Sequence, residues 1–257
     1  MARRFDGTTG DYILLGINSI GPLLDGAGAV TVAARYNQDN AAAASEYLYY
    51  VASFTGWAVM ALYVNSSNKA VIGGRARYNT TWREKASTGS PSAGSWNTLV
   101  GVLDYANDNI YIYLNGTRES SLSVTFGGTS YTHDTSTRDD DCLGIADSNG
   151  LTAPVDGNMA EVAIWAGDIG LPNMAAFNAG VCPLLIFPST LICYWPLTGR
   201  TSPEIELISR KTGAVTGAAA VAHPPVIYPQ GLIIPEMTAY SAPAGGVSYR
   251  RRLILAG

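Results

Sequence analysis

The feature that most constrains the fold is a hairpin signature over residues 95–116, SWNTLVGVLDYANDNIYIYLNG. An apolar run passes into turn-forming residues at 104–109 and then into an alternating stretch that ends at Asn115-Gly116. This pattern predicts two strands joined by a loop. Successive strand residues face opposite sides of a sheet, so one side should be core and the other aromatic. The core side carries Ile110, Ile112 and Leu114, and the aromatic side carries Tyr111 and Tyr113.

The same reading applied along the chain predicts many short strands and one helix. Strands are expected at residues 3–17, 29–36, 46–54, 57–64, 69–78, 122–126, 142–146, 159–166 and 191–197, and a surface loop at 79–95. The helix is expected at residues 171–179, with Pro172 in its first turn and Gly180 at its C-cap. Strands at this spacing indicate an antiparallel sandwich.

Several of these segments together resemble the laminin-G-like or concanavalin-A-like lectin and glucanase superfamily. Its pattern of Trp, apolar strand, Asp-containing turn and "ihlYvNG" strand matches residues 96–116, and its later "G.idEvriw" strand matches residues 157–165. Residues 4–13, RFDGTTGDYI, are similar to its first strand. The resemblance covers roughly residues 3–217 and implies an all-β jelly-roll sandwich, with residues 191–197 placed against the opening strand. It says little about function, because this fold carries many unrelated sites.

Composition and charge exclude several classes of protein. Charged residues make up only 14% of the chain while Gly numbers 28 and Tyr 15, which suits strands and turns better than helices. The net charge of −4 argues against nucleic-acid binding. No apolar run approaches the ~20 residues of a membrane span. The start of the chain lacks the apolar region of a signal peptide, so we expect synthesis in a host cytoplasm.

The three cysteines, Cys142, Cys182 and Cys193, show neither a CxxC motif nor metal-ligand spacing. We interpret them as small hydrophobic residues. The glucanase arrangement Glu-x-Asp-x-x-Glu does not occur in the chain, and Glu161, which matches the family's Glu in the "idEv" strand, is interpreted as structural. The sequence therefore predicts a protein that is not an enzyme.

Residues 221–257 differ in kind from residues 1–220, the predicted sandwich domain. Frequent prolines separate short apolar stretches there. Prolines at this density prevent both a helix and a central strand. Three alternatives stay open: an extended C-terminal arm packed on its own domain, an arm that reaches into a neighbouring subunit or larger assembly, or a disordered tail. The residues expected to make assembly contacts are Pro225, Ile227, Tyr228, Leu232, Ile234, Arg250, Arg251, Arg252 and Leu253.

Two ligand sites are considered. Relatives with this fold often hold Ca²⁺ with Asp, Asn and backbone oxygens, and the candidates here are Asp139, Asp140, Asp141 and Asp147. An Asp run of this kind is equally typical of a solvated loop, so no cofactor is assigned. A sugar-binding sheet face is the second candidate, since aromatic rings stack on sugars. Its residues would be Tyr47, Tyr49, Trp57, Tyr63, Tyr111 and Tyr113, although such residues often serve packing instead.

The leading functional hypothesis is a non-enzymatic virion structural protein. Low charge, no signal peptide and a Pro-rich apolar arm resemble laminin-G-like proteins of tailed bacteriophages, such as capsid decoration proteins and head fibres. The arm would contact the major capsid or another virion protein while the sandwich faces solvent, and the protein would form a homo-oligomer such as a trimer. The alternative is a lectin module, calcium-dependent or not, that binds a glycan for adhesion.

Overall fold

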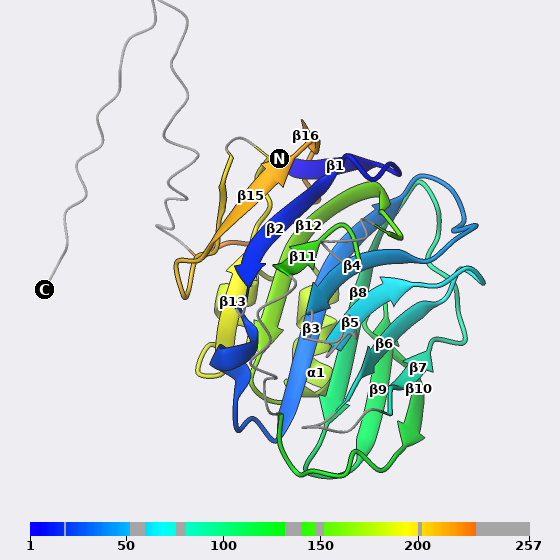
Figure 1. Cartoon of the computed structure of the whole chain (residues 1–257), viewed down its shortest axis with the longest axis vertical. Helices are drawn as coiled ribbons and strands as arrows, with labels where there is room; N and C mark the ends of the chain where they lie inside the picture. Colours follow the sequence, from blue (N-terminus) through cyan, green and yellow to red (C-terminus); the bar gives the residue numbers. More distant parts are fainter. Residues whose placement is uncertain are drawn as a thin grey trace, which may run out of the picture.

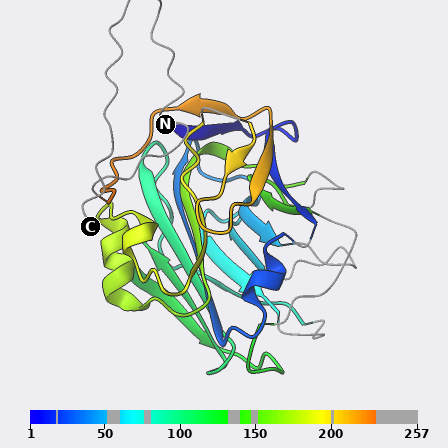
Figure 2. The same ribbon diagram turned by 90° about the vertical axis from the view of Figure 1, so that its left-hand side faces the viewer.

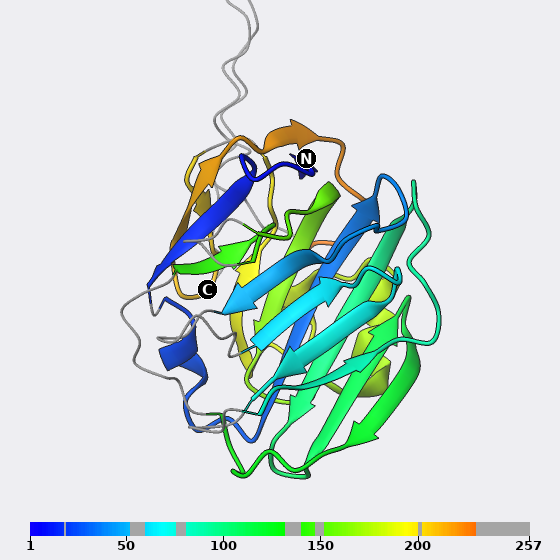
Figure 3. The same ribbon diagram turned by 45° about the vertical axis from the view of Figure 1, so that its right-hand side comes forward.

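The computed structural model describes residues 1–17, 19–51, 60–75, 81–131, 140–146, 152–199 and 202–229. In this part of the chain two eight-stranded sheets stack face to face (Figure 1). Neighbouring strands run antiparallel, as the alternating sequence predicts. Figure 3 shows strands of the second sheet, in blue to cyan, crossing in front of the first. The predicted antiparallel jelly-roll sandwich is confirmed.

The first sheet has the order β10-β9-β8-β3-β12-β1-β16, with β13 also paired to β12. Its strands are β1 (Ala2–Asp6), β3 (Ala29–Gln38), β8 (Trp96–Asp104), β9 (Asn109–Leu114), β10 (Thr117–Ser123), β12 (Asp156–Trp165), β13 (Leu191–Trp195) and β16 (Ala219–Val221). The predicted hairpin is confirmed as β8 and β9, in which Leu99 is the register partner of Leu114.

The second sheet has the order β14-β15-β2-β11-β4-β5-β6-β7. Its strands are β2 (Tyr12–Ile17), β4 (Glu46–Val51), β5 (Met60–Val64), β6 (Ala70–Gly74), β7 (Arg83–Ala86), β11 (Asp140–Leu143), β14 (Glu204–Ile205) and β15 (Thr212–Thr216). Two 3₁₀ turns, η1 (Gly21–Leu24) and η2 (Pro183–Leu185), lie in connections between strands.

Four sequence-based expectations need correction. The opening segment forms two strands in different sheets, β1 and β2. The expected loop at 79–95 contains β7, and the strand expected at 122–126 lies earlier, as β10; both are polar edge strands without an apolar alternation. β13 does not lie against β1. The long strand β12 pairs with β1 through residues 156–159 and with β13 through residues 162–165, so β1 and β13 follow one another along the same edge.

The core lies between the sheets and follows the two-residue period. Val30, Val32 and Ala34 of β3 face inward, and Met60 and Leu62 of β5 meet them from the opposite sheet. The sheets come so close at β8 and β6 that a Cβ added to Gly101 would lie 2.3 Å from the Cβ of Ile72. Glycine at this position is therefore required by the inter-sheet spacing.

The helix α1 (Gly170–Asn178) covers the outer side of the first sheet (Figure 2). Its Met174 and Phe177 are buried and belong to a second apolar cluster with Val100, Trp165 and Tyr194. The predicted helix is confirmed within one residue at each end. None of the helices in the described ranges is long and apolar enough to cross a membrane.

The C-terminal segment, defined here as residues 222–229, packs on its own sandwich. Cys182 donates its backbone N–H to Ile227 O at 3.0 Å, and Ile227 donates to Gly180 O at 2.7 Å, forming a parallel bridge. Arg35 reaches Pro225 O at 3.2 Å, and Tyr228 packs against the cluster under α1. The first alternative for the arm therefore holds for residues 222–229. Leu232, Ile234, Arg250, Arg251, Arg252 and Leu253 lie outside the described residues.

Candidate functional site

Two tyrosines stack on the outer side of the second sheet. Tyr47 of β4 and Tyr63 of β5 are register partners, and their rings are nearly parallel, at 4° with centroids 4.5 Å apart. Cross-strand partners share a sheet face, which explains why the two rings meet. Tyr63 is buried and Tyr47 is half-buried, so the pair presents an aromatic surface at the boundary with solvent.

Tyr49 does not join this pair, although it stands two residues from Tyr47. The register of β4 against β5 shifts between Tyr47 and Tyr49, which is the mark of a β-bulge. The extra residue turns Tyr49 into the inter-sheet core, where it is fully buried, and turns Tyr50 outward instead. The prediction of Tyr49 as a surface aromatic is therefore wrong. Tyr50 meets Tyr47 edge-on, with centroids 5.9 Å apart.

Two further residues complete the cluster: Glu84 of β7, and Trp82, which lies just before β7. Trp82 Nε1 donates to Glu84 Oε2 at 2.6 Å, and the Tyr63 hydroxyl donates to the same oxygen at 2.7 Å. Glu84 is exposed, and its Oε1 has no hydrogen-bond partner among the described residues. Tyr47, Tyr50, Tyr63, Trp82 and Glu84 are called the aromatic face below.

The indole of Trp82 packs directly against Gly73. A Cβ added to Gly73 of β6 would lie 2.3–2.8 Å from three atoms of the Trp82 ring. The absence of a side chain at Gly73 lets the indole approach the sheet. Trp82 is half-buried, so it is held from one side and still partly open to solvent.

The hydroxyls of this face are neutral donors at physiological pH. Burial raises the pKa of Tyr63, and the neighbouring Glu84 carboxylate adds to that effect. Burial also raises the pKa of Tyr47, again with a contribution from Glu84. The arrangement thus offers aromatic rings, phenolic hydroxyls and one fixed carboxylate, which can stack on an apolar ring and exchange hydrogen bonds with hydroxyl groups.

The other predicted aromatic residues lie elsewhere. Tyr111 and Tyr113 belong to β9 in the first sheet, and both face its outer side, where Tyr113 is buried in the cluster under α1. Arg118 lies 5.4 Å from the Tyr111 ring centroid, as in a cation–π contact. The expectation that all six aromatics share one sheet face is therefore wrong, because the chain places them on opposite sides of the sandwich. Trp57 lies outside the described residues.

The predicted calcium ligands are only partly described. Asp141 is buried, and its Oδ2 accepts the backbone N–H of Ile20 at 2.8 Å, which anchors the start of η1. Asp139, Asp147 and the side chain of Asp140 fall outside the described part. Across the described ranges no group of three His, Cys, Asp or Glu side chains could hold a metal ion. The calcium site stays a prediction.

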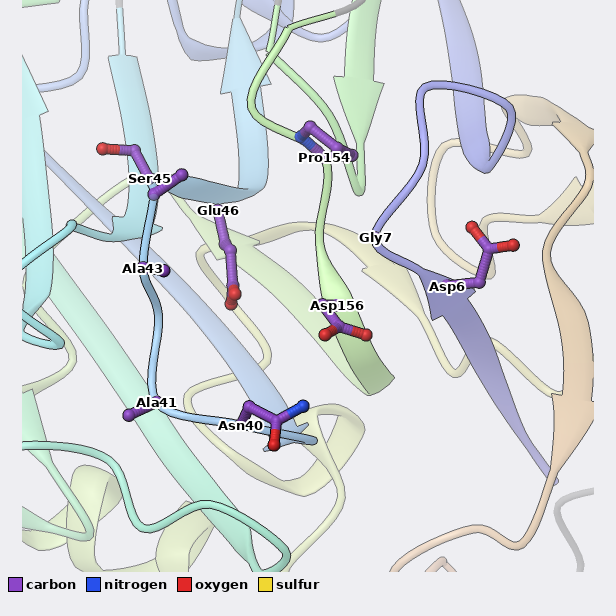
Figure 4. Close-up of a pocket in the computed structure, with 10 residues that line it drawn as sticks. Asp6, Gly7, Asn40, Ala41, Ala43, Ser45, Glu46, Pro154 and Asp156 are labelled. Atoms are coloured by element: carbon purple, nitrogen blue, oxygen red, sulfur yellow. The ribbon is translucent and has the colours of Figure 1, made fainter.

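A separate polar pocket of about 470 Å³ opens at one rim of the sandwich (Figure 4). Glu46, Asp156 and Asp6 line it together with small residues of the β3–β4 connection. The Tyr36 hydroxyl lies within hydrogen-bond distance of Glu46 and 2.8 Å from Asp156 O. In the first of these contacts the hydroxyl donates to Glu46 Oε2. Burial raises the pKa of Glu46 to about 7, although the hydrogen bond from Tyr36 acts in the opposite direction.

The sequence matches the model of a known protein family. A family model described as the concanavalin A-like lectin/glucanases superfamily matches residues 6–169. The chain belongs to this superfamily. The resemblance inferred from residues 96–116 and 157–165 is confirmed. No curated protein matches the sequence.

Solved structures with the same fold include proteins of carbohydrate recognition. A Bacteroides ovatus protein named as a candidate carbohydrate-binding protein superposes with a TM-score of 0.65 at 17% identity, covering 88% of this chain and 61% of its own. The chain thus spans about three fifths of that relative. The CBM40 of the Ruminococcus gnavus IT-sialidase, bound to α2,3-sialyllactose, gives a TM-score of 0.54 at 13% identity, covering 69% of this chain and 97% of its own. At these identities the likeness concerns the fold.

Sequence reasoning missed Trp82 and Glu84, because the composition of residues 79–95 resembles a loop. A signal was present in the two-residue spacing of Trp82, Glu84 and Ala86, which places all three on one side of a strand. The period was hard to recognise because β7 is an edge strand, and the residues between these three, Arg83 and Lys85, are also polar.

Proposed function

We propose that the protein is a non-catalytic carbohydrate-binding module that binds a glycan on the aromatic face. The observation that carries this proposal is the single oxygen of Glu84 held by both Tyr63 and Trp82, beside the stacked Tyr47. Fixed polar groups next to aromatic rings are what a sugar requires, since its C–H face packs on rings while its hydroxyls need partners. The superfamily and its carbohydrate-binding structural neighbours support the same function.

A glycan array tests this proposal with three proteins. The unmodified protein should bind a defined subset of glycans, and Trp82→Ala should weaken that binding about tenfold or more, equivalent to ~1.4 kcal/mol. Tyr111→Ala is the matched control, because Tyr111 is also a half-buried aromatic but lies on the outer side of the other sheet. Equal binding by all three proteins would refute the assignment of the face. A parallel array with a chelator would separate calcium-dependent from calcium-independent binding.

We propose further that this module acts on a virion, as a bacteriophage capsid decoration or head-fibre protein. The support lies in the sequence: beyond Pro229 the chain continues with apolar pieces and a basic tip, suited to docking on a shell by burial and by pairing with acidic groups. The sandwich would then face solvent with its aromatic face available for adhesion. Homo-oligomerisation would multiply a weak glycan contact through avidity.

Mass spectrometry of purified particles from the source tests the virion role. A copy number near that of the major capsid protein would identify a decoration protein, and a few copies would identify a fibre. Absence of the chain from particles would refute the virion role and leave the glycan-binding proposal untouched.

A further inference from the structure

Among the described residues, Glu84 of the aromatic face has no positively charged partner. Both hydrogen bonds to this carboxylate come from neutral donors, Tyr63 and Trp82, and they meet at one oxygen. No ion pair to Glu84 forms among the described residues. Its strand neighbours Arg83 and Lys85 are directed to the other side of β7, because successive strand residues alternate. Within the described residues no cation therefore compensates this carboxylate.

One oxygen of the Glu84 carboxylate is held by two donors and the other is not. Trp82 and Tyr63 reach Oε2 at 2.6 and 2.7 Å, and Oε1 has no hydrogen-bond partner among the described residues. A carboxylate oxygen only accepts hydrogen bonds, and bonds to a charged acceptor are about twice as strong as neutral ones. A ligand group at this position must therefore be a donor.

We propose that Glu84 makes the aromatic face selective for uncharged sugars, whose hydroxyls donate to Oε1, and excludes glycans that present an acidic sugar at this position. This inference rests on the proposed glycan-binding function. A sialic or uronic acid would bring a second carboxylate towards Glu84, and like charges at short range repel. Hydroxyls of an uncharged ring satisfy the same oxygen without that penalty.

The experiment compares uncharged oligosaccharides with their sialylated and uronic-acid-containing counterparts on one array. The unmodified protein should bind uncharged glycans at least tenfold more tightly than the acidic counterparts. Glu84→Gln keeps the size of the side chain but removes the charge, so it should reduce that preference by about tenfold. The control is Glu119→Gln, which changes a half-buried carboxylate on β10 that accepts hydrogen bonds from Thr88 and Gly89. This variant should keep the full preference.

Each outcome distinguishes the two proposals. Equal or tighter binding of acidic glycans, or an unchanged preference in Glu84→Gln, would overturn the selectivity while the glycan site itself stands. Absence of binding to every glycan would overturn the proposed function and the selectivity with it. Thermal unfolding and tryptophan fluorescence of Glu84→Gln verify that Trp82 keeps its place, and Gly73→Ala provides the contrasting case in which the indole is displaced.

Discussion

His223 Nε2 lies 3.2 Å from Glu161 Oε1, and this contact fastens the C-terminal segment to the sandwich. The Tyr194 and Tyr228 hydroxyls donate to the same carboxyl group at 2.7 and 3.0 Å. Glu161 is fully buried, so these partners satisfy oxygens that water does not reach. The glutamate that the sequence pattern marked as structural thus joins the segment, through His223 and Tyr228, to β12 and β13.

Both ring nitrogens of His223 lie near oxygen atoms of the sandwich or the segment. Nδ1 lies 2.8 Å from Pro224 O, and Nε2 lies 3.1 Å from Pro196 O as well as near Glu161. The ring therefore links the C-terminal segment to the sandwich through Pro196 and Glu161.

Glu161→Gln should loosen the C-terminal segment. The substitution keeps the shape of the side chain but replaces one acceptor oxygen with an amide group that only donates. One of the donors that now reach Glu161 is left without an acceptor, and an unsatisfied buried group costs about 1–3 kcal/mol. Hydrogen exchange of the Cys182 and Ile227 amides, which form the bridge to the segment, should accelerate. Glu119→Gln is the control, since Glu119 is half-buried on β10 and takes its hydrogen bonds from Thr88 and Gly89, outside the segment. Unchanged exchange in Glu161→Gln would show that the contacts of Glu161 do not hold the segment.

Gly101→Ala should destabilise the sandwich. The new Cβ would lie 2.3 Å from the Ile72 Cβ, and overpacking of this kind costs about 1–3 kcal/mol. Chemical denaturation measures the loss. Gly167→Ala serves for comparison, because its Cβ would meet Thr190 only at 3.8 Å, an ordinary contact. The inter-sheet spacing described here is wrong if both variants lose the same stability.

Glu46 should make a contribution to stability that falls as the pH rises from about 5 to 8. Its pKa is raised from 4.5 to about 7 by burial, so between those values the folded state binds more protons than the unfolded state. The contribution of Glu46 is then fully present below pH 4.5 and is lost as the pH rises through about 7. Each step of one in pKa corresponds to about 1.4 kcal/mol, which gives a total of roughly 3 kcal/mol.

Glu46→Gln should flatten this dependence, measured as the free energy of unfolding across the pH range. Hydrogen bonds from Thr88 and Gly89 lower the pKa of Glu119, so that group titrates below the range. Glu119→Gln should therefore leave the slope as it is. A slope that survives in Glu46→Gln would mean that the pocket carboxyl is ionised throughout.

Tyr49→Phe should be neutral or stabilising by about 1 kcal/mol. The Tyr49 hydroxyl is buried and has no hydrogen-bond partner within the described part of the chain, and an unsatisfied buried group costs about 1–3 kcal/mol. Glycan binding should not change, because the ring lies in the inter-sheet core. Denaturant unfolding and the glycan array measure the two effects, and loss of binding in Tyr49→Phe would contradict the bulge in β4.

Most of the architecture was predictable because local and tertiary preferences agree. In the hairpin of β8 and β9, apolar and aromatic residues alternate, turn-forming residues join the strands, and a glycine follows the second strand. The helix α1 has a proline in its first turn and a glycine after its end. The edge strands β7 and β10 were not predictable in the same way. Polar residues occupy both of their faces, so the alternation that marks a half-buried strand is missing.

The site was harder to predict than the fold. A one-residue bulge turns Tyr49 into the core and Tyr50 to the outer side of the sheet, and the sequence contains no signal for this bulge. Similarly, Tyr47 and Tyr111 occur in strands of the same alternating type, and only the order of strands shows that they lie on opposite sides of the sandwich. Composition of a strand predicts its faces but not the sheet to which it belongs.

The pairing of β1 with β16 makes Ala2 and Val221 register partners in neighbouring antiparallel strands. Both strands are therefore reached from one corner of the molecule. A mechanical load applied between these two residues would separate β1 and β16 one hydrogen-bonded pair at a time, as a zipper opens. A load between the C-terminal segment and a ligand on the aromatic face would instead cross both sheets and their shared core, so the protein should resist traction on a bound surface far better than traction between Ala2 and Val221.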